Sequence, residues 1–379
     1  MLLVATGCVQ PESVSRAPSL PECANGRLLS PDKVATCLEV QGNIMAADRD
    51  TALRVFSRAI TLRDSLFVDT TPVSFTDAAY LTLSLGSIGD FYSRGLFADS
   101  ARFHRMVDQV AITMDQVHGT ITYVNGHAYP SKTPYLAWKL YDNLGVYFQP
   151  VETAQQVAYI VTQVASPTDS VIAIAEHLYR YALWRTHRGV RYPVWEYEFP
   201  WTSGGVSVNA PWVSGLAQAA IMVLFAECYR RTGNSLWRDR AMSVFHSLLI
   251  PWDEGGVLLP DTTHGYWFEE FHPTVQVWNG GAQALLGVGF LATVTGDSAV
   301  KRVYQSGLAA MKYYTPFYDT GAWTRYSRTQ GLNSLFYHQF CIQIADALYT
   351  QTADTWFKDL ADRWRSYSPP SGVQTMGSQ

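Results

Sequence analysis

Gly233-Asn234-Ser235 and Gly296-Asp297-Ser298 are two nearly identical short segments, 63 positions apart, and they decide the fold of this chain. A glycine directly after a helix adopts the left-handed conformation that ends it, and Asn, Asp or Ser before the next helix caps its free amide groups. Each segment therefore predicts a tight turn between two helices. Ala353-Asp354 has an equivalent place near the C-terminus and predicts a third turn.

The spacing of apolar residues around these turns predicts three helical hairpins. Their helices span Ser214–Arg231 and 235–250, Asn279–Val294 and Ala299–Tyr314, and Ser334–Thr350 and Thr355–Tyr367. Long segments, Pro251–Val277 and Phe317–Asn333, connect one hairpin to the next. Because repeated hairpins close most naturally into an α/α toroid, we expect a mainly α fold, an incomplete α/α barrel with the long segments around a cleft at one rim.

The chain before residue 210 is also predicted to be mostly helical, with apolar periodicity from about Asp48. Further helices are predicted at Thr76–Phe91, Ser100–Asp115, Val151–Ala165 and Asp169–Arg188, and short β-segments of the rim at Thr120–Val124, Gly145–Phe148, Gly256–Leu259 and Tyr266–Phe271. Residues 41–368 are therefore expected to form one toroidal domain, between a tether at 1–40 and a disordered tail at 369–379.

The composition excludes some classes of function. The 379 residues carry a formal net charge of −4, so there is no excess of basic residues for nucleic acid. No glycine-rich phosphate loop or nucleotide fingerprint occurs, which argues against a nicotinamide-dependent epimerase of nucleotide sugars. Trp and Tyr are abundant, at 12 and 22 residues; most of these rings are expected in a core, and some could stack on sugars in a cleft.

The N-terminus, Met1-Leu-Leu-Val-Ala-Thr-Gly-Cys8, is similar to the end of a bacterial lipoprotein signal. A lipid on Cys8 would tether the protein to a membrane, and the Pro- and Ser-rich residues 10–21 would serve as a linker. The alternative is an apolar tip without structure. Cys23 and Cys37 could pair in an oxidising compartment, so an extracytoplasmic location is expected.

The first long segment contains Gly265-Tyr-Trp-Phe-Glu-Glu-Phe-His272. In a strand, Glu269 and Glu270 face opposite sides, so only one can point into a cleft. Aromatic neighbours would raise the pKa of that carboxyl into the range of a useful general base. The alternative is a carboxylate in a salt bridge at the rim. A metal site with His264 and His272 is disfavoured, because no ligand spacing such as H-E-x-x-H occurs.

The second long segment contains Tyr318-Asp-Thr-Gly321, followed by Arg325, Tyr326 and Arg328. Arginine can bind a carboxylate with two parallel hydrogen bonds, and a nearby cation lowers the pKa of a phenol. These residues therefore suit an acidic ligand. A cluster of surface Arg and aromatic side chains is the alternative.

Two more motifs stand on either side of these long segments: Ala210-Pro-Trp-Val-Ser214 and Phe336-Tyr-His338. With them, residues 210–364 resemble the C-terminal domain of the glucuronyl C5-epimerases. The resemblance implies that Glu270 is a catalytic base and that Tyr337 is the second catalytic group. Tyr326 is expected as a third catalytic residue, which helps Arg328 and Asn279 to neutralise the charge that develops on the uronate carboxylate. It departs from the family at Phe271, where a tyrosine is expected. A fainter resemblance upstream, at Gly145-Val-Tyr-Phe-Gln-Pro150, departs in the same way at Gln149. From the residues alone, Tyr337 would be a core phenol.

The resemblance also implies which residues bind substrate. Asn279 would supply an amide, and Trp212 a ring for stacking on sugar. The other candidates are Tyr147, Gln218, Arg325, Arg328 and His338. Gln218 could equally be a buried structural residue.

The family inverts glucuronate to iduronate within an anionic polysaccharide, and a heparosan-like polymer is the expected substrate. Removing the proton on C5 and returning one to the opposite face requires a base and an acid but no cofactor. The animal members suggest a homodimer. Two alternatives stay open: a uronate lyase that uses the same proton abstraction, and a non-catalytic lipoprotein that binds acidic glycans.

Overall fold

Contacts within the chain group it into two compact units, residues 1–117 and 118–379. The computed structural model describes residues 23, 26–69, 71–121, 123–124, 127–128, 135–155, 168–203, 205–259 and 263–373. The expected lipid site at Cys8 and the last six residues of the expected tail lie outside them. The domain boundaries expected from the sequence stay predictions.

The first unit is helical. Its helices are α1 (Pro31–Val40), α2 (Ala46–Val68), α3 (Pro72–Ser93) and α4 (Ser100–Val117), and α2, α3 and α4 pack on one another. Residues 31–40, which the sequence placed in the tether, thus form a helix. A disulfide joins Cys23 to Cys37 and fixes α1 to the segment before it.

Three helical hairpins form the second half of the second unit, as the turns predict. They are α7 (Gly215–Thr232) with α8 (Ser235–Leu248), α9 (Trp278–Thr295) with α10 (Ser298–Tyr318), and α11 (Leu335–Thr352) with α12 (Thr355–Arg365). The residues after α7, α9 and α11 all have left-handed conformations: Gly233 (φ 67°), Gly296 (φ 68°) and Ala353 (φ 55°). The side chains of Asn234, Asp297 and Asp354 accept amide hydrogens of the following helices.

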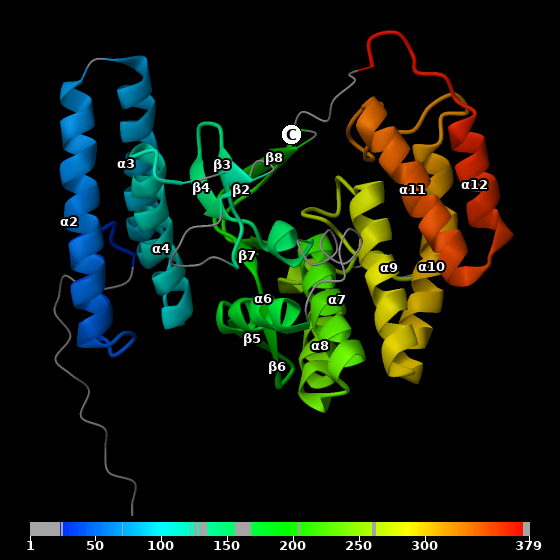
Figure 1. The fold of residues 1–379 in the computed structure, drawn as a ribbon, viewed down its shortest axis with the longest axis horizontal. Coiled ribbons are helices and arrows are strands. Elements are labelled where there is room, and N and C mark those ends of the chain that lie inside the picture. Colours follow the sequence, from blue (N-terminus) through cyan, green and yellow to red (C-terminus); the bar gives the residue numbers. More distant parts are fainter. Residues whose placement is uncertain are drawn as a thin grey trace, which may run out of the picture. The chain divides into compact units, whose positions relative to one another are not determined.

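The hairpins lie next to one another in chain order. The first helices of the pairs, α7, α9 and α11, contact each other in succession, and each also contacts the helix that follows it. Figure 1 shows this row from green through yellow to red. The protein is therefore mainly helical, with its largest helical core in residues 215–365.

Short strands precede the hairpins. An antiparallel sheet has the order β1 (Tyr123–Val124), β2 (His127–Ala128), β3 (Trp138–Tyr141) and β4 (Gly145–Phe148). Three two-stranded sheets pair β5 (Leu183–His187) with β6 (Val190–Val194), β7 (Glu196–Tyr197) with β10 (Trp212–Val213), and β8 (Trp201–Ser203) with β9 (Val206–Val208). Helix α6 (Thr168–Arg180) packs on α7, and a short 3-10 helix, η2, spans Trp252–Glu254.

Two predicted elements differ from the structure. The helix predicted at Asp169–Arg188 ends at Arg180, because 183–187 and 190–194 form a hairpin. Its two connecting residues, Arg188 and Gly189, both have positive φ angles, which is the geometry of a tight two-residue β-turn. The strand pair predicted near residues 256–271 is reduced to one bridge between Leu258 and Phe268.

Two other predictions are met only in part. Strand β4 has the predicted bounds, while β1 covers only the end of the predicted 120–124 segment. Of the helix predicted at 151–165, residues 151–155 are helical and the rest lie outside the described residues. No helix among the described residues is long and apolar enough to cross a membrane.

Candidate active site

A pocket of about 300 Å³ lies within the second unit, where the strands meet the N-terminal ends of α7, α9 and α11. Its lining comes from β3, from the residues after β4, from β7, β8 and β10, and from the long segments that connect the hairpins. Five of the residues predicted for the site line it: Trp212, Glu270, Asn279, Tyr326 and Tyr337.

Glu270 lines the pocket, whereas its neighbour Glu269 is fully buried on the other side of the chain. The backbone of Glu269 is anchored by hydrogen bonds with Val257 and Gly215 (Glu269 N–O Val257 2.7 Å, Gly215 N–O Glu269 2.8 Å). These bonds fix the direction of the adjacent Glu270 side chain. A β-carbon at Gly280 would lie 2.3 Å from Glu270 Oε2, so the carboxyl fits there only because position 280 is glycine.

The carboxyl of Glu270 has the properties of a general base. Oε2 is buried and has no hydrogen-bond partner among the described residues. Burial raises the pKa of Glu270 to about 7, because a low-dielectric environment disfavours the charged form. At neutral pH a large fraction is ionised and can accept a proton, as an effective general base requires.

Tyr337 enters the pocket from the first turn of α11. Ser334 caps this helix by accepting the backbone N–H of Tyr337, which anchors the backbone from which the phenol extends. Burial, together with the nearby Glu270 charge, raises the pKa of Tyr337 to about 12. The phenol therefore stays protonated at neutral pH and can act as an acid. The ring of Tyr326 lies 5.1 Å from that of Tyr337 in an edge-to-face contact.

Asn279 and Trp212 provide binding groups. Asn279 is the second residue of α9 and is 5% exposed; its Oδ1 has no hydrogen-bond partner among the described residues, so it can accept one from a ligand hydroxyl. Trp212 stacks on Tyr197 with 4.2 Å between ring centres, and its indole N–H donates to the carbonyl of Phe199 at 2.8 Å. These contacts hold the Trp212 ring at the pocket wall.

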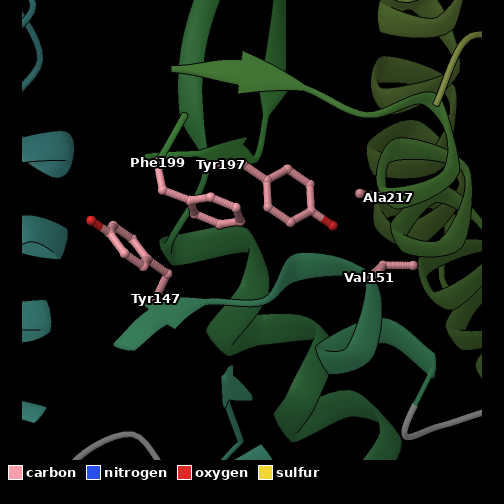
Figure 2. Packing of buried hydrophobic residues seen from close by; sticks show 5 residues of the cluster. All are labelled: Tyr147, Val151, Tyr197, Phe199 and Ala217. Carbon is pink, nitrogen blue, oxygen red and sulfur yellow. The ribbon is translucent and has the colours of Figure 1, made fainter. Parts of the chain in front are cut away.

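Tyr147, predicted to bind substrate, does not line the pocket. It is buried on β4 in the apolar cluster that Figure 2 shows, with its ring 4.8 Å from that of Phe199. Gln149, two residues later, lines the pocket instead. It accepts the hydroxyl hydrogen of Tyr197 at 2.7 Å and donates to the hydroxyl oxygen of Tyr141.

Arg325 and Arg328 are exposed and do not line the pocket. Arg328 donates to Gln276 Oε1 at 3.0 Å and lies over the ring of Phe317 at 5.1 Å. This is the surface Arg–aromatic arrangement that the sequence left as an alternative.

Gln218 and His338 are buried away from the pocket and make structural hydrogen bonds. Gln218 bonds to the backbone of Trp195 and Pro193 and to Ser247. His338 bonds to Thr324 and to the carbonyl of Trp364, and its ring stacks on Trp323 at 3.6 Å.

One wall of the pocket was not predicted from the sequence; the residues that help to form it are Lys139, Tyr141, Glu152 and Tyr197. The alternation in Trp138-Lys-Leu-Tyr141 and in Glu196-Tyr-Glu-Phe199 is the signal that could have indicated strands with one face toward a cleft. Among the described residues, no group of three or more His, Cys, Asp or Glu is placed to hold a metal ion.

Residues 188–366 match the family model of the D-glucuronyl C5-epimerase C-terminus. This part of the chain belongs to that domain family. The epimerase C-terminal domain thus contains Trp212, Glu270, Asn279, Tyr326 and Tyr337, and the resemblance noted in the sequence is confirmed for it. The wall made by residues 139–155 precedes the matched segment.

The chain is also similar to the uncharacterized protein MJ1128 of Methanocaldococcus jannaschii. The two are 26% identical over 184 residues, which cover 47% of this chain and 59% of that protein. The chain therefore matches only part of the length of that relative, and the relative brings no activity to the comparison.

Proposed function

We propose that the protein is a uronate C5-epimerase that acts on residues within an anionic polysaccharide. The observation that carries this proposal is the presence of Glu270 and Tyr337 in one pocket with complementary proton states. The pKa of Glu270 near 7 suits a base, and the pKa of Tyr337 near 12 suits a proton donor. The family of residues 188–366 supports the same chemistry.

In the proposed reaction, the Glu270 carboxylate removes the proton on C5 of a glucuronate residue. The electron pair of the broken C–H bond moves toward the adjacent carboxylate, whose growing charge must be stabilised. Tyr337 then donates its hydroxyl proton to C5 from the opposite face, which gives iduronate. The new phenolate and the protonated Glu270 exchange protons with water to restore the site. The reaction requires no cofactor.

Substrate binding in this proposal uses the aromatic wall and the free amide oxygen. A sugar ring would lie against Trp212, and Asn279 Oδ1 would accept a sugar hydroxyl. A heparosan-like polymer is the proposed substrate. Phe271 stands where the family has tyrosine; it is 3% exposed and its ring lies 6.3 Å from that of Trp212, so it supports the wall without supplying a hydroxyl.

Four further features belong to this proposal. The succession of hairpins α7 to α12 supports an incomplete α/α toroid around the pocket. The Cys23–Cys37 disulfide supports an extracytoplasmic location, since disulfides persist in oxidising compartments. The proposal also includes a membrane tether through lipid on Cys8 and a homodimer.

Product analysis tests the proposal. The protein would be incubated with heparosan, and the polymer examined for iduronate by NMR, for chain length, and for ultraviolet absorbance. The proposal predicts iduronate in chains of unchanged length. Shorter chains with an absorbing unsaturated uronate would instead show a lyase. Tight binding without either product, on every uronate polymer tried, would show a glycan-binding protein.

A further inference from the structure

The pocket needs a positive group for the carboxylate of a uronate, and the predicted arginines do not supply it. Arg325 and Arg328 lie outside the lining. In the part of the chain that the structure describes, Lys139 is the only Lys or Arg that lines the pocket, together with two acidic residues, Glu152 and Glu270. Lys139 is thus the cation available to an acidic ligand there.

Strand β3 directs two polar groups to the same side. Lys139 and Tyr141 are two positions apart in the strand, so their side chains leave the same face. The pairing of Lys139 with Tyr147 and of Tyr141 with Gly145 fixes this face relative to β4. The ammonium of Lys139 lies 5.4 Å from the centre of the Tyr141 ring, and both residues line the pocket.

Lys139 has no ion-pair partner among the described residues. It is half-buried, and its ammonium lies over the face of the Tyr141 ring. A partly buried ammonium without a carboxylate partner is a favourable site for an anion, because little competing attraction has to be broken. Two acidic residues, Glu152 and Glu270, share this lining, and the charge of Glu152 acts on Tyr141, so Lys139 is needed to offset their repulsion of an anion.

The hydroxyl of Tyr141 is oriented by Gln149. The Gln149 amide donates to Tyr141 Oη, while its carbonyl oxygen accepts from Tyr197. The Tyr141 hydroxyl oxygen is thus an acceptor in this chain of bonds, and its own hydrogen is left to donate. Burial, together with the charge of Glu152, raises the pKa of Tyr141, so the hydroxyl keeps that hydrogen at neutral pH.

We propose that Lys139 and Tyr141 on β3 form the carboxylate-binding site of this pocket and determine its preference for uronates over neutral sugars. The proposal rests on the proposed function for the identity of the ligand. Lys139 Nζ contributes the charge and Tyr141 Oη a hydrogen bond. The same contacts would stabilise the negative charge that develops when C5 loses its proton.

Binding of two matched polymers tests the site. Heparosan and heparosan with its carboxyl groups reduced to alcohols would be titrated against the wild-type protein, Lys139→Met, Lys139→Arg and the control Lys301→Met, which removes an exposed lysine of α10. We expect Lys139→Met to weaken heparosan binding about tenfold or more, from the loss of a charged hydrogen bond. Binding of the reduced polymer, which also reports the fold, should stay unchanged, and Lys139→Arg should retain most of the preference.

Equal binding of the two polymers by the wild-type protein, or binding of neither, would overturn the proposal. An unchanged preference in Lys139→Met would also overturn it. Tyr141→Phe should reduce the preference by a smaller factor. The proposed epimerase activity can be wrong while this site is right. A wild-type protein that prefers heparosan through Lys139 but never exchanges the C5 hydrogen would have the carboxylate-binding site without the epimerase reaction.

Discussion

The backbone of Gly280 lies against the carboxyl of Glu270 so closely that a β-carbon there would be 2.3 Å from Oε2 and 2.9 Å from the β-carbon of Glu270. The backbone of the first turn of α9 therefore packs directly against the carboxyl of Glu270, the proposed base. The same turn places Asn279 in the pocket. One short sequence, Trp278-Asn-Gly280, thus positions both the base and a binding amide.

Gly280→Ala should displace the Glu270 carboxyl and reduce kcat about tenfold or more, since small misplacements of a reacting group are costly. The substitution is on a helix and should leave the far-ultraviolet circular dichroism unchanged. Gly86→Ala is the matched control. Gly86 is an exposed position within α3 and its β-carbon would meet nothing within 4 Å, so the substitution should raise stability by about 0.5–1 kcal/mol without affecting activity. Full activity of Gly280→Ala would show that the close approach does not matter.

The rate should rise with pH through about 7, because Glu270 must lose its proton to act as a base. The rate of epimerisation measured between pH 5 and 9 tests this. A flat profile across this range would contradict the role of Glu270.

The raised pKa of Glu270 also has a consequence for stability. Between the ordinary value of 4.5 and about 7, the folded carboxyl binds more protons than the unfolded one. Its contribution to stability therefore decreases as pH rises through this window. Relative to wild type, Glu270→Gln should gain up to about 3 kcal/mol between pH 4 and pH 8. Denaturant unfolding at both pH values measures this difference; no difference would mean that the folded pKa is not raised.

Tyr337→Phe should lower kcat by about 10²–10⁴-fold, the usual range for loss of a general acid. The free energy of unfolding should hardly change, because no hydrogen bond of the Tyr337 hydroxyl occurs among the described residues. Tyr304→Phe is a control in which stability should change and activity should not. Its hydroxyl donates to Gln351 at 2.5 Å, so the variant should lose about 1 kcal/mol of stability and keep its activity.

The Cys23–Cys37 disulfide should stabilise the first unit. Cys23 and Cys37 are 14 positions apart, and a closed loop of that size stabilises a fold by about 3 kcal/mol. Replacing both cysteines by serine should lower the stability of α1 to α4 by that order, as measured by hydrogen exchange of their amides. Identical exchange in the two proteins would show that packing alone holds this unit.

The hairpins could be predicted from the sequence because their signals are local. A left-handed residue followed by a capping Asn or Asp acts within four positions, and all three turns form as expected. The opposite orientations of Glu269 and Glu270 could also be predicted, because adjacent side chains in an extended segment point to opposite sides.

The rest of the site depends on contacts between distant segments. Tyr337 and His338 are adjacent on a helix and so point about 100° apart; the sequence could not show which of them faces the pocket. Arg328 was expected near the substrate, but its long side chain bonds to Gln276, 52 positions away. The alternation around Lys139 and Tyr197 could indicate strands with one face toward a cleft, but only the fold brings that face into the same pocket as Glu270.

Incorporation of deuterium at C5 of heparosan in heavy water shows whether Glu270 removes the C5 proton, when wild-type protein and Glu270→Gln are compared by NMR. We expect deuterium at C5 in intact chains with the wild type and none with Glu270→Gln. Equal incorporation by the two proteins, or none by a wild-type protein that binds the polymer, would contradict it.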